Sequence, residues 1–157
     1  MDSQRTIEAL LYICPKLSVK GYYQMMKVLY WADKYHLAHY GRTITEDTYY
    51  KLEDGPVPTE IYDKFKNRTL LDGNFKSDSF IYTPIREPNL DFLSESDLEA
   101  LEYSVNKYGN KSYGELKRLS HDASWEAAPE FGPIDFDQFI LTFKKSTQEE
   151  LKEYLSA

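Results

Sequence analysis

The sequence predicts a mainly α protein of the α+β class: a compact helical domain with a small β-hairpin or short antiparallel sheet. Apolar residues recur with helical period along a segment that ends at Gly41. After residue 94, serines stand three positions before acidic residues, which is typical of capped helix starts. Residues 42–52 and 80–85 are rich in β-branched and aromatic side chains, which favours strands. The chain of 157 residues has no repeat and no linker, so we expect a single domain over residues 1–157.

Two helices are expected before Gly41. The first covers residues 6–14 and ends at Pro15, because proline cannot continue the hydrogen-bonded pattern. Ser18 then stands where an N-cap would start a long helix, and Gly41 where a glycine would end it. Trp31 lies away from the apolar stripe of this helix, so it is either exposed or packed against a second layer. The stripe consists of Tyr22, Met25, Met26, Leu29, Tyr30, Leu37 and Tyr40.

The β element is expected between the long helix and the C-terminal helices. Residues 42–52 predict one strand or two short ones, and Gly55-Pro56-Val57-Pro58 predicts a rigid turn. Residues 80–85 predict a strand that pairs with the first, at a sheet edge because of Pro84. A helix over about 58–65 and a polar loop over 67–79 are expected between them.

Capping residues define the helices of the C-terminal half. The expected helices run from a Ser94 cap with Asp97 to Tyr108, from a Ser112 cap with Glu115 to Leu119, from Asp135 to about Phe143, and from a Ser146 cap with Glu149 to Leu155. One further turn is expected at residues 125–128.

Composition restricts the location and the partners of the chain. Cys14 is the one cysteine, so no internal disulfide can form, and we expect a reducing, cytoplasmic setting. No apolar run approaches the roughly 20 residues that span a bilayer, so no membrane partner is expected. The net charge of -7 disfavours sequence-independent binding of nucleic acid. Phosphate-binding glycine loops and nucleophile motifs are absent from the sequence.

The acidic charge is concentrated in one part of the chain. Basic and acidic side chains balance in residues 1–80, so the whole excess lies in residues 81–157. The segment 122–143 contains no Lys or Arg, and its acidic residues are Asp122, Glu126, Glu130, Asp135 and Asp137. It is either a solvated rim or a docking face for a basic protein. Tyrosine is also frequent, at 14 residues, and tyrosine is enriched both in half-exposed cores and at interfaces.

Asp33 and His36 fall inside the apolar stripe of the long helix, with His39 toward its edge. A carboxylate facing a core needs a partner, and we consider His36, His121, a tyrosine hydroxyl and the backbone N–H groups of residues 55–58. Three interpretations remain open: a structural polar contact, a partner-contact site, and a metal or acid–base site. The last would use Asp33, His36 and His121, although the spacing of Asp33, His36 and His39 is poor for a single metal ion.

Several motifs together resemble the SocA-like, or Panacea, antitoxin domain. They are Met25-Met26-Lys27-Val28-Leu29-Tyr30-Trp31-Ala32-Asp33, His36-Leu37-Ala38, Tyr40-Gly41-Arg42, Gly55-Pro56-Val57-Pro58 with Ile61-Tyr62, and Leu119-Ser120-His121-Asp122-Ala123-Ser124-Trp125. The resemblance covers roughly residues 5–128. Ser124 departs from the family pattern, which has proline before the tryptophan. Residues after about 130 lie outside the resemblance, and we expect them to form a lineage-specific C-terminal helical extension.

The resemblance implies an antitoxin of a toxin–antitoxin system that neutralises a cognate protein toxin by direct binding, without catalysis or a cofactor. Toxins neutralised by members of this family are varied and include ones that block translation, and the acidic half would suit a basic, RNA-directed toxin. Alternatives are a proteolytic adaptor or regulator that delivers the toxin for degradation and a metal-assisted hydrolase. We expect either a homo-oligomer or a toxin–antitoxin heteromer. The motif residues would form scaffold or toxin contacts: Lys27, Tyr30, Trp31, Asp33, His36, Gly41, Gly55, Pro56, Val57, Pro58, Ile61, Tyr62, His121, Asp122 and Trp125. The acidic residues expected to face the partner are Glu126, Glu130, Asp135 and Asp137.

Overall fold

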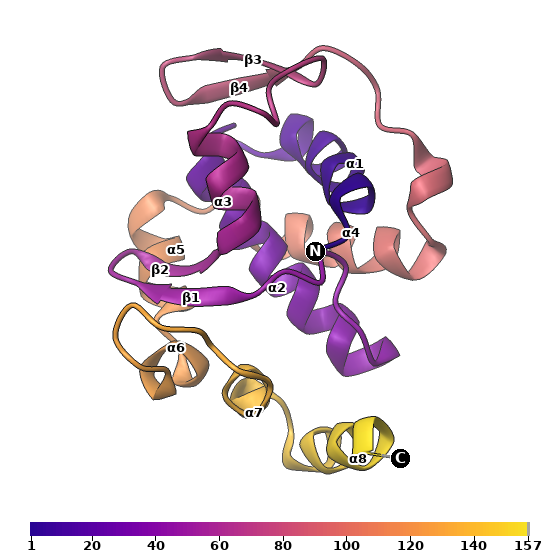
Figure 1. Cartoon of the computed structure of the whole chain (residues 1–157), viewed down its shortest axis with the longest axis vertical. Helices are drawn as coiled ribbons and strands as arrows, with labels where there is room; N and C mark the ends of the chain where they lie inside the picture. The colour runs from indigo at the N-terminus through magenta and orange to yellow at the C-terminus, as the bar shows by residue number, and fades with distance from the viewer. Residues whose placement is uncertain (157) are drawn as a thin grey trace.

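A long helix, α2 (Tyr22–Tyr40), runs through the middle of the protein, and the other elements surround it (Figure 1). The structure is a computed structural model that describes residues 1–156. Its other elements are α1 (Ser3–Ile13), β1 (Tyr49–Leu52), β2 (Gly55–Pro58), α3 (Thr59–Lys66), β3 (Phe75–Asp78), β4 (Ile81–Pro84), α4 (Glu95–Tyr108), α5 (Tyr113–Ser120), α6 (Ala123–Ala127), α7 (Phe136–Phe139) and α8 (Lys145–Ser156). Three short 3-10 helices are η1 (Cys14–Lys16), η2 (Leu90–Phe92) and η3 (Ile140–Thr142). The predicted mainly α fold with small antiparallel β elements is confirmed.

Helix α2 is buried on nearly all sides between Met25 and Leu37. The predicted apolar stripe therefore describes only part of its buried surface, and polar residues such as Lys27 and Lys34 are buried as well. The sequence left open whether Trp31 is exposed or packed against a second layer. It is packed, since its ring stacks on that of Tyr108 with centroids 3.8 Å apart. Within residues 1–156, no helix is both long and apolar enough to cross a membrane.

The two ends of α2 differ in how well the sequence predicts them. Gly41 ends the helix with φ of 81°, a left-handed conformation that favours glycine, as predicted. The predicted start at Ser18 is wrong, because the helix begins at Tyr22 with Gly21 as its N-cap. The preceding residues pair with β4 instead: Tyr82 N–H donates to the Lys20 carbonyl over 2.8 Å, and Gly21 forms a β-bridge with Ile81.

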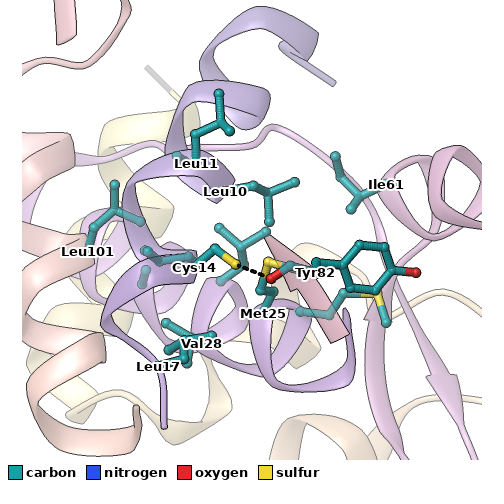
Figure 2. Close-up of a cluster of buried hydrophobic side chains, with 14 of the residues drawn as sticks. Leu10, Leu11, Cys14, Leu17, Met25, Val28, Ile61, Tyr82 and Leu101 are labelled. Atoms are coloured by element: carbon teal, nitrogen blue, oxygen red, sulfur yellow. Dashed lines mark hydrogen bonds between the residues drawn. The ribbon is translucent and has the colours of Figure 1, made fainter. Parts of the chain in front are cut away.

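The main hydrophobic core lies where α1, α2, α3, α4 and the second hairpin meet. Figure 2 shows Leu10 of α1, Cys14 of η1, Met25 of α2 and Leu101 of α4 converging, with Tyr82 of β4 beside them. The Cys14 thiol donates to the Tyr82 carbonyl over 3.5 Å (Figure 2). Burial raises the pKa of Cys14 to about 11, so the thiol is neutral at physiological pH.

Strands β1 and β2 form a tight antiparallel hairpin in which Tyr49 faces Pro58 and Leu52 faces Gly55. The prediction of a turn at residues 55–58 is wrong, since this segment is strand β2 and the turn is at residues 53–54. The expected strand over 42–52 is also shorter, starting at Tyr49. Gly55 has φ of 122°, and a Cβ there would lie 2.6 Å from Ser120 Oγ and 2.8 Å from Lys27 Cε. Only glycine fits this position, because it combines left-handed geometry with close packing.

Strands β3 and β4 form a second hairpin that lies at the opposite end of the molecule from α6, α7 and α8 (Figure 1). The sequence predicts a loop where β3 lies, and it predicts that residues 80–85 pair with the first strand. Both predictions are wrong, because β4 pairs with β3 and Phe75 faces Pro84. Phe75 is buried in the main core, and β1 is already paired with β2, so the local pairing satisfies both strands.

Capping boxes start α4 at Ser94 and α5 at Ser112, as predicted. Asp135 starts α7 as predicted, also with a capping box, but α7 ends at Phe139 and the rest of the expected helix is η3. Helix α8 begins at Lys145, so the predicted Ser146 cap lies inside the helix instead. The last helices pack on a second core cluster that includes Tyr30 and Tyr49. This cluster also contains Trp31, Leu37, Leu116, Ala128, Ile134, Phe139, Ile140 and Leu151. Residues after 130 therefore share a core with α2.

A buried ion pair fixes the connection between the second hairpin and α4. The Glu8 side chain is 0% exposed, and both nitrogens at the end of Arg86 donate to it over 2.8 Å. The Asn89 backbone N–H donates to the same carboxylate over 2.7 Å. The hydrogen bond from Arg86 is the main cause that lowers the pKa of Glu8, so this carboxylate is ionised.

Replacing Arg86 with Ala leaves the Glu8 carboxylate buried without its cation. We expect the free energy of unfolding at neutral pH to fall by about 2–3 kcal/mol, less than for a fully buried pair because water can reach the Arg86 position. Urea denaturation followed by circular dichroism measures this change, with Arg118→Ala on the exposed side of α5 as the control. Equal midpoints for the two variants would contradict the expectation.

Candidate functional site

The family-like motifs converge on one face of α2. Tyr23, Lys27, Tyr30 and Lys34 follow one another at helical spacing and form a second, polar stripe. This stripe contacts the β1–β2 hairpin and the segment from Ser120 to Ser124. Motif pieces that are far apart in the sequence are therefore joined through the side chains of one helix.

Lys27 joins α2 to the first hairpin from inside the protein. Its side chain is buried, and Nζ donates to the Pro56 carbonyl over 2.8 Å. The ammonium also lies 4.5 Å from the centre of the Tyr23 ring, a cation–π contact. Burial lowers the pKa of Lys27 to about 7, which the negative charge of Asp54 partly opposes. The close approach of Gly55 covers this ammonium, which explains the glycine at the start of β2.

Lys34 joins α2 to the C-terminal segment. Nζ donates to Ser124 Oγ over 2.7 Å, to the Phe139 carbonyl over 3.0 Å and to Thr142 Oγ1 over 2.6 Å. The Asp122 carboxylate lies 3.5 Å away and also accepts from the Tyr30 hydroxyl over 2.9 Å. Burial lowers the pKa of Lys34 to about 8, so the group is still charged at neutral pH.

Asp33 lies beside the polar stripe, about 100° around α2 from Lys34, and is completely buried. Its carboxylate accepts hydrogen bonds from the backbone N–H groups of Ile44 and Thr45, over 2.7 and 3.1 Å. The hydroxyls of Thr45 and Tyr49 donate over 2.6 and 2.8 Å. The expectation of a tyrosine partner is confirmed, whereas His36, His121 and the backbone of residues 55–58 are not its partners. Burial raises the pKa of Asp33 to about 6 despite these four hydrogen bonds.

The histidines occupy separate environments. His36 is buried and lies between the Arg42 carbonyl and the Ser96 hydroxyl, each 2.8 Å away, with an Asp97 oxygen at 3.3 Å. Burial lowers the pKa of His36, so the ring is neutral at physiological pH. His39 is exposed and stacks on Tyr35.

His121 stacks on Trp125 with ring centroids 3.9 Å apart. The Trp125 indole N–H donates to the Leu52 carbonyl over 2.8 Å, so this stack fixes the end of α5 against β1. Asp122 caps α6 by accepting from the Trp125 backbone N–H over 3.0 Å. Ser124, which replaces the expected proline, uses its hydroxyl to bind the Phe139 carbonyl over 2.9 Å.

The structure does not bring the suggested hydrolase residues together. Asp33, His36 and His121 each have a different set of neighbours, and none of their hydrogen bonds joins two of them. Within residues 1–156, no group of three His, Cys, Asp or Glu side chains is arranged to hold a metal ion. The geometry therefore gives no support to the metal or acid–base interpretation.

The remaining motif residues are mostly interior. Val57 and Ile61 belong to the main core, and Tyr62 packs against its edge. Pro58 precedes the first turn of α3, while Gly41 lies under the Tyr154 ring of α8. Pro56 is buried and supplies the carbonyl that binds Lys27.

The four acidic residues expected to face a partner are all exposed, on α6, α7 and the loop between them. Glu130 lies 3.2 Å from Lys51 Nζ, and Asp135 accepts from the Gln138 backbone N–H over 2.9 Å as the cap of α7. Glu126 and Asp137 extend from α6 and α7, which pack together at the lower end of the molecule in Figure 1. We call the exposed surface of Glu126, Glu130, Asp135 and Asp137 the acidic surface.

Lys34 is the main residue that the sequence analysis missed. It falls outside the apolar stripe, and lysine is usually exposed. The recurrence of Tyr23, Lys27, Tyr30 and Lys34 at helical spacing is the signal that could have identified it. Thr45 and Asp97 were also missed, because they bind residues of α2 from loops or helices distant in the sequence.

Comparison with protein families identifies the chain. The family model described as "Antitoxin SocA-like, Panacea domain" matches residues 25–126, which is more than half of the chain. The chain therefore belongs to the SocA-like Panacea domain family of antitoxins. Family membership assigns it an antitoxin role in general terms and a toxin as its partner. Comparison with curated proteins gives no match, and comparison with solved structures gives none.

The first prediction from this site concerns the pH dependence of Asp33. Its pKa of about 6 lies above the ordinary 3.8, so the folded state takes up the proton first as pH falls. Relative to Asp33→Asn, the wild-type protein should gain about 1.4 kcal/mol of unfolding free energy per pH unit below 6. Urea midpoints of both proteins from pH 7 to about pH 5 measure this difference, and Asp72→Asn is an exposed control. A difference that does not change with pH would contradict it.

A second prediction concerns Lys34. Lys34→Met removes the ammonium that holds Phe139 and Thr142 against α2. Hydrogen bonds to a charged group contribute about 1.5–3 kcal/mol each, so amide exchange in residues 139–156 should be at least about tenfold faster. Exchange measured by mass spectrometry tests this, with Lys152→Met on the exposed face of α8 as the control. Identical exchange in the two variants would contradict the role of Lys34.

Proposed function

We propose that this protein neutralises a cognate protein toxin by binding it directly, without catalysing a reaction. The observation that carries the proposal is the match of residues 25–126 to the antitoxin family. The site geometry supports it, because the buried charged side chains of α2, Lys27, Asp33 and Lys34, are engaged in internal contacts that hold the fold. Such groups are fixed in place and covered, as a scaffold requires.

The acidic surface supports a basic toxin as the partner. Its carboxylates are exposed, and the segment 122–143 carries no Lys or Arg of its own. Complementary charge accelerates encounter and suppresses wrong partners. A toxin that acts on translation meets RNA, and proteins that bind RNA depend on Lys and Arg that neutralise phosphates. An acidic protein surface would compete for those same residues.

The buried motif residues and the acidic surface would have different roles. Buried motif residues such as Lys27, Asp33 and His36 would hold the shared scaffold. The acidic surface, of which only Glu126 lies within the matched residues, would contact the toxin. We propose a toxin–antitoxin heteromer as the active assembly, in a cytoplasmic setting.

Coexpression with the product of the neighbouring gene tests the proposal. Growth arrest caused by that product should be relieved, and the two proteins should copurify as a stable complex. The amount of the toxin should stay constant when growth is rescued. Rescue accompanied by disappearance of the toxin would indicate an adaptor for proteolysis, and absence of both complex and rescue would reject the antitoxin role.

Charge reversal tests the acidic surface. The double variant Glu126→Lys/Asp137→Lys should weaken the complex by about tenfold or more, because two attractive contacts become repulsive. The double variant Asp72→Lys/Asp78→Lys changes the net charge equally, on exposed residues near the second hairpin. Calorimetric titration with the neighbouring gene product at low and high salt compares the two. Equal affinities for both variants would rule out the acidic surface as the contact.

A further inference from the structure

Phe131 is an exposed aromatic residue in a strained turn. Its side chain is 70% exposed, although removing a phenyl ring from water is energetically favourable. Its backbone φ is 56°, in the left-handed region that a bulky residue rarely adopts. Nothing in the hydrophobic clusters of residues 1–156 includes this ring. The side chain therefore contributes little to the fold that would offset the strain.

The turn that carries Phe131 is held rigidly. Gly132 N–H donates to the Pro129 carbonyl over 2.9 Å. On the following side, Lys51 N–H donates to the Gly132 carbonyl and Ile134 N–H to the Tyr49 carbonyl, both over 2.8 Å. Residues 132–134 are thus attached to the edge of β1. The phenyl ring is presented from a fixed backbone, which reduces the entropy lost on binding.

The segment that carries Phe131, residues 122–143, contains five acidic residues and no Lys or Arg. The basic side chain of Lys51 forms an ion pair with Glu130 in this turn and is 9% exposed. Its Nζ lies 3.2 Å from Glu130 and 3.4 Å from the carbonyls of Glu126 and Ala128. The loop itself covers this ammonium. The charged groups of the loop that an external partner can reach are therefore mainly carboxylates.

Phe80 provides a comparison within the same chain. It is 72% exposed and follows Ser79, whose φ is 57°, in the turn of the second hairpin. The charges around it are mixed, with Lys76 and Asp78 both exposed. The hairpin of β3 and β4, whose turn contains Phe80, lies at the opposite end of the molecule from α6 and α7 (Figure 1). Exposure and strain alone therefore do not distinguish Phe131 from Phe80. The acidic surface in the same segment as Phe131 does distinguish it.

We propose that Phe131 is the anchor residue of the toxin interface: its ring inserts into an apolar pocket of the toxin, and the acidic surface binds Lys and Arg residues around that pocket. This inference rests on the proposed function and adds the contact residue and the chemistry of the partner surface. Aromatic side chains buried at the centre of an interface and surrounded by a polar rim commonly supply most of its binding energy.

Affinity measurements on two phenylalanine variants test the proposal. The wild-type protein, Phe131→Ala and Phe80→Ala are titrated with the neighbouring gene product by calorimetry. We expect Phe131→Ala to weaken binding at least tenfold and Phe80→Ala to change it less than twofold. Binding by Phe131→Ala that equals the wild type would overturn the anchor role while leaving the antitoxin function intact. Absence of binding by the wild-type protein would instead reject the proposed function.

A glycine variant separates binding from folding. Phe131→Gly relieves the left-handed strain, so its melting temperature should equal or exceed that of the wild type. Its affinity for the neighbouring gene product should fall at least tenfold, as for Phe131→Ala. A lower melting temperature would mean that the ring stabilises the fold. This would contradict the proposal that Phe131 serves toxin binding.

Discussion

The structure depends on one constraint: α2 is buried on nearly all sides, so each of its polar side chains needs a partner inside the protein. Lys27 binds the Pro56 carbonyl of the first hairpin, and Lys34 binds Ser124 and the C-terminal segment. Asp33 binds the loop before β1. These contacts determine where the elements around α2 lie, because a misplaced element would leave a buried charge unpaired.

This constraint explains why many of the motif residues are charged or aromatic although they are buried. Burial opposes the charged forms of Lys27 and Asp33 and moves their pKa values toward neutrality, to about 7 and about 6. Shifted pKa values often mark active sites. Here the two groups lie about 120° apart around α2 and have separate partners, so the shifts follow from burial in a polar network. The surface remains available for partner binding.

Local signals in the sequence predict much of the fold. Gly41 ends α2, and the capping boxes at Ser94 and Ser112 start α4 and α5, because caps depend on residues close in the chain. Strand pairing and the start of α2 depend on distant residues: Lys20 pairs with Tyr82, which keeps Ser18 out of the helix. For the same reason, the buried partners of Asp33 were only partly predictable. The carboxylate indicates that donors are needed, but the fold decides that Ile44 and Thr45 supply them.

The buried network and the proposed docking turn are connected through β1. The Asp33 carboxylate fixes the Tyr49 hydroxyl, and the Tyr49 carbonyl accepts from Ile134 N–H at the end of the turn that carries Phe131. Two residues further along β1, Lys51 holds Gly132 through its backbone and Glu130 through its side chain. A turn with a strained residue persists only when its surroundings fix it from several sides. The interior contacts of the shared domain thus give the following loop the rigidity that a specific protein interface needs.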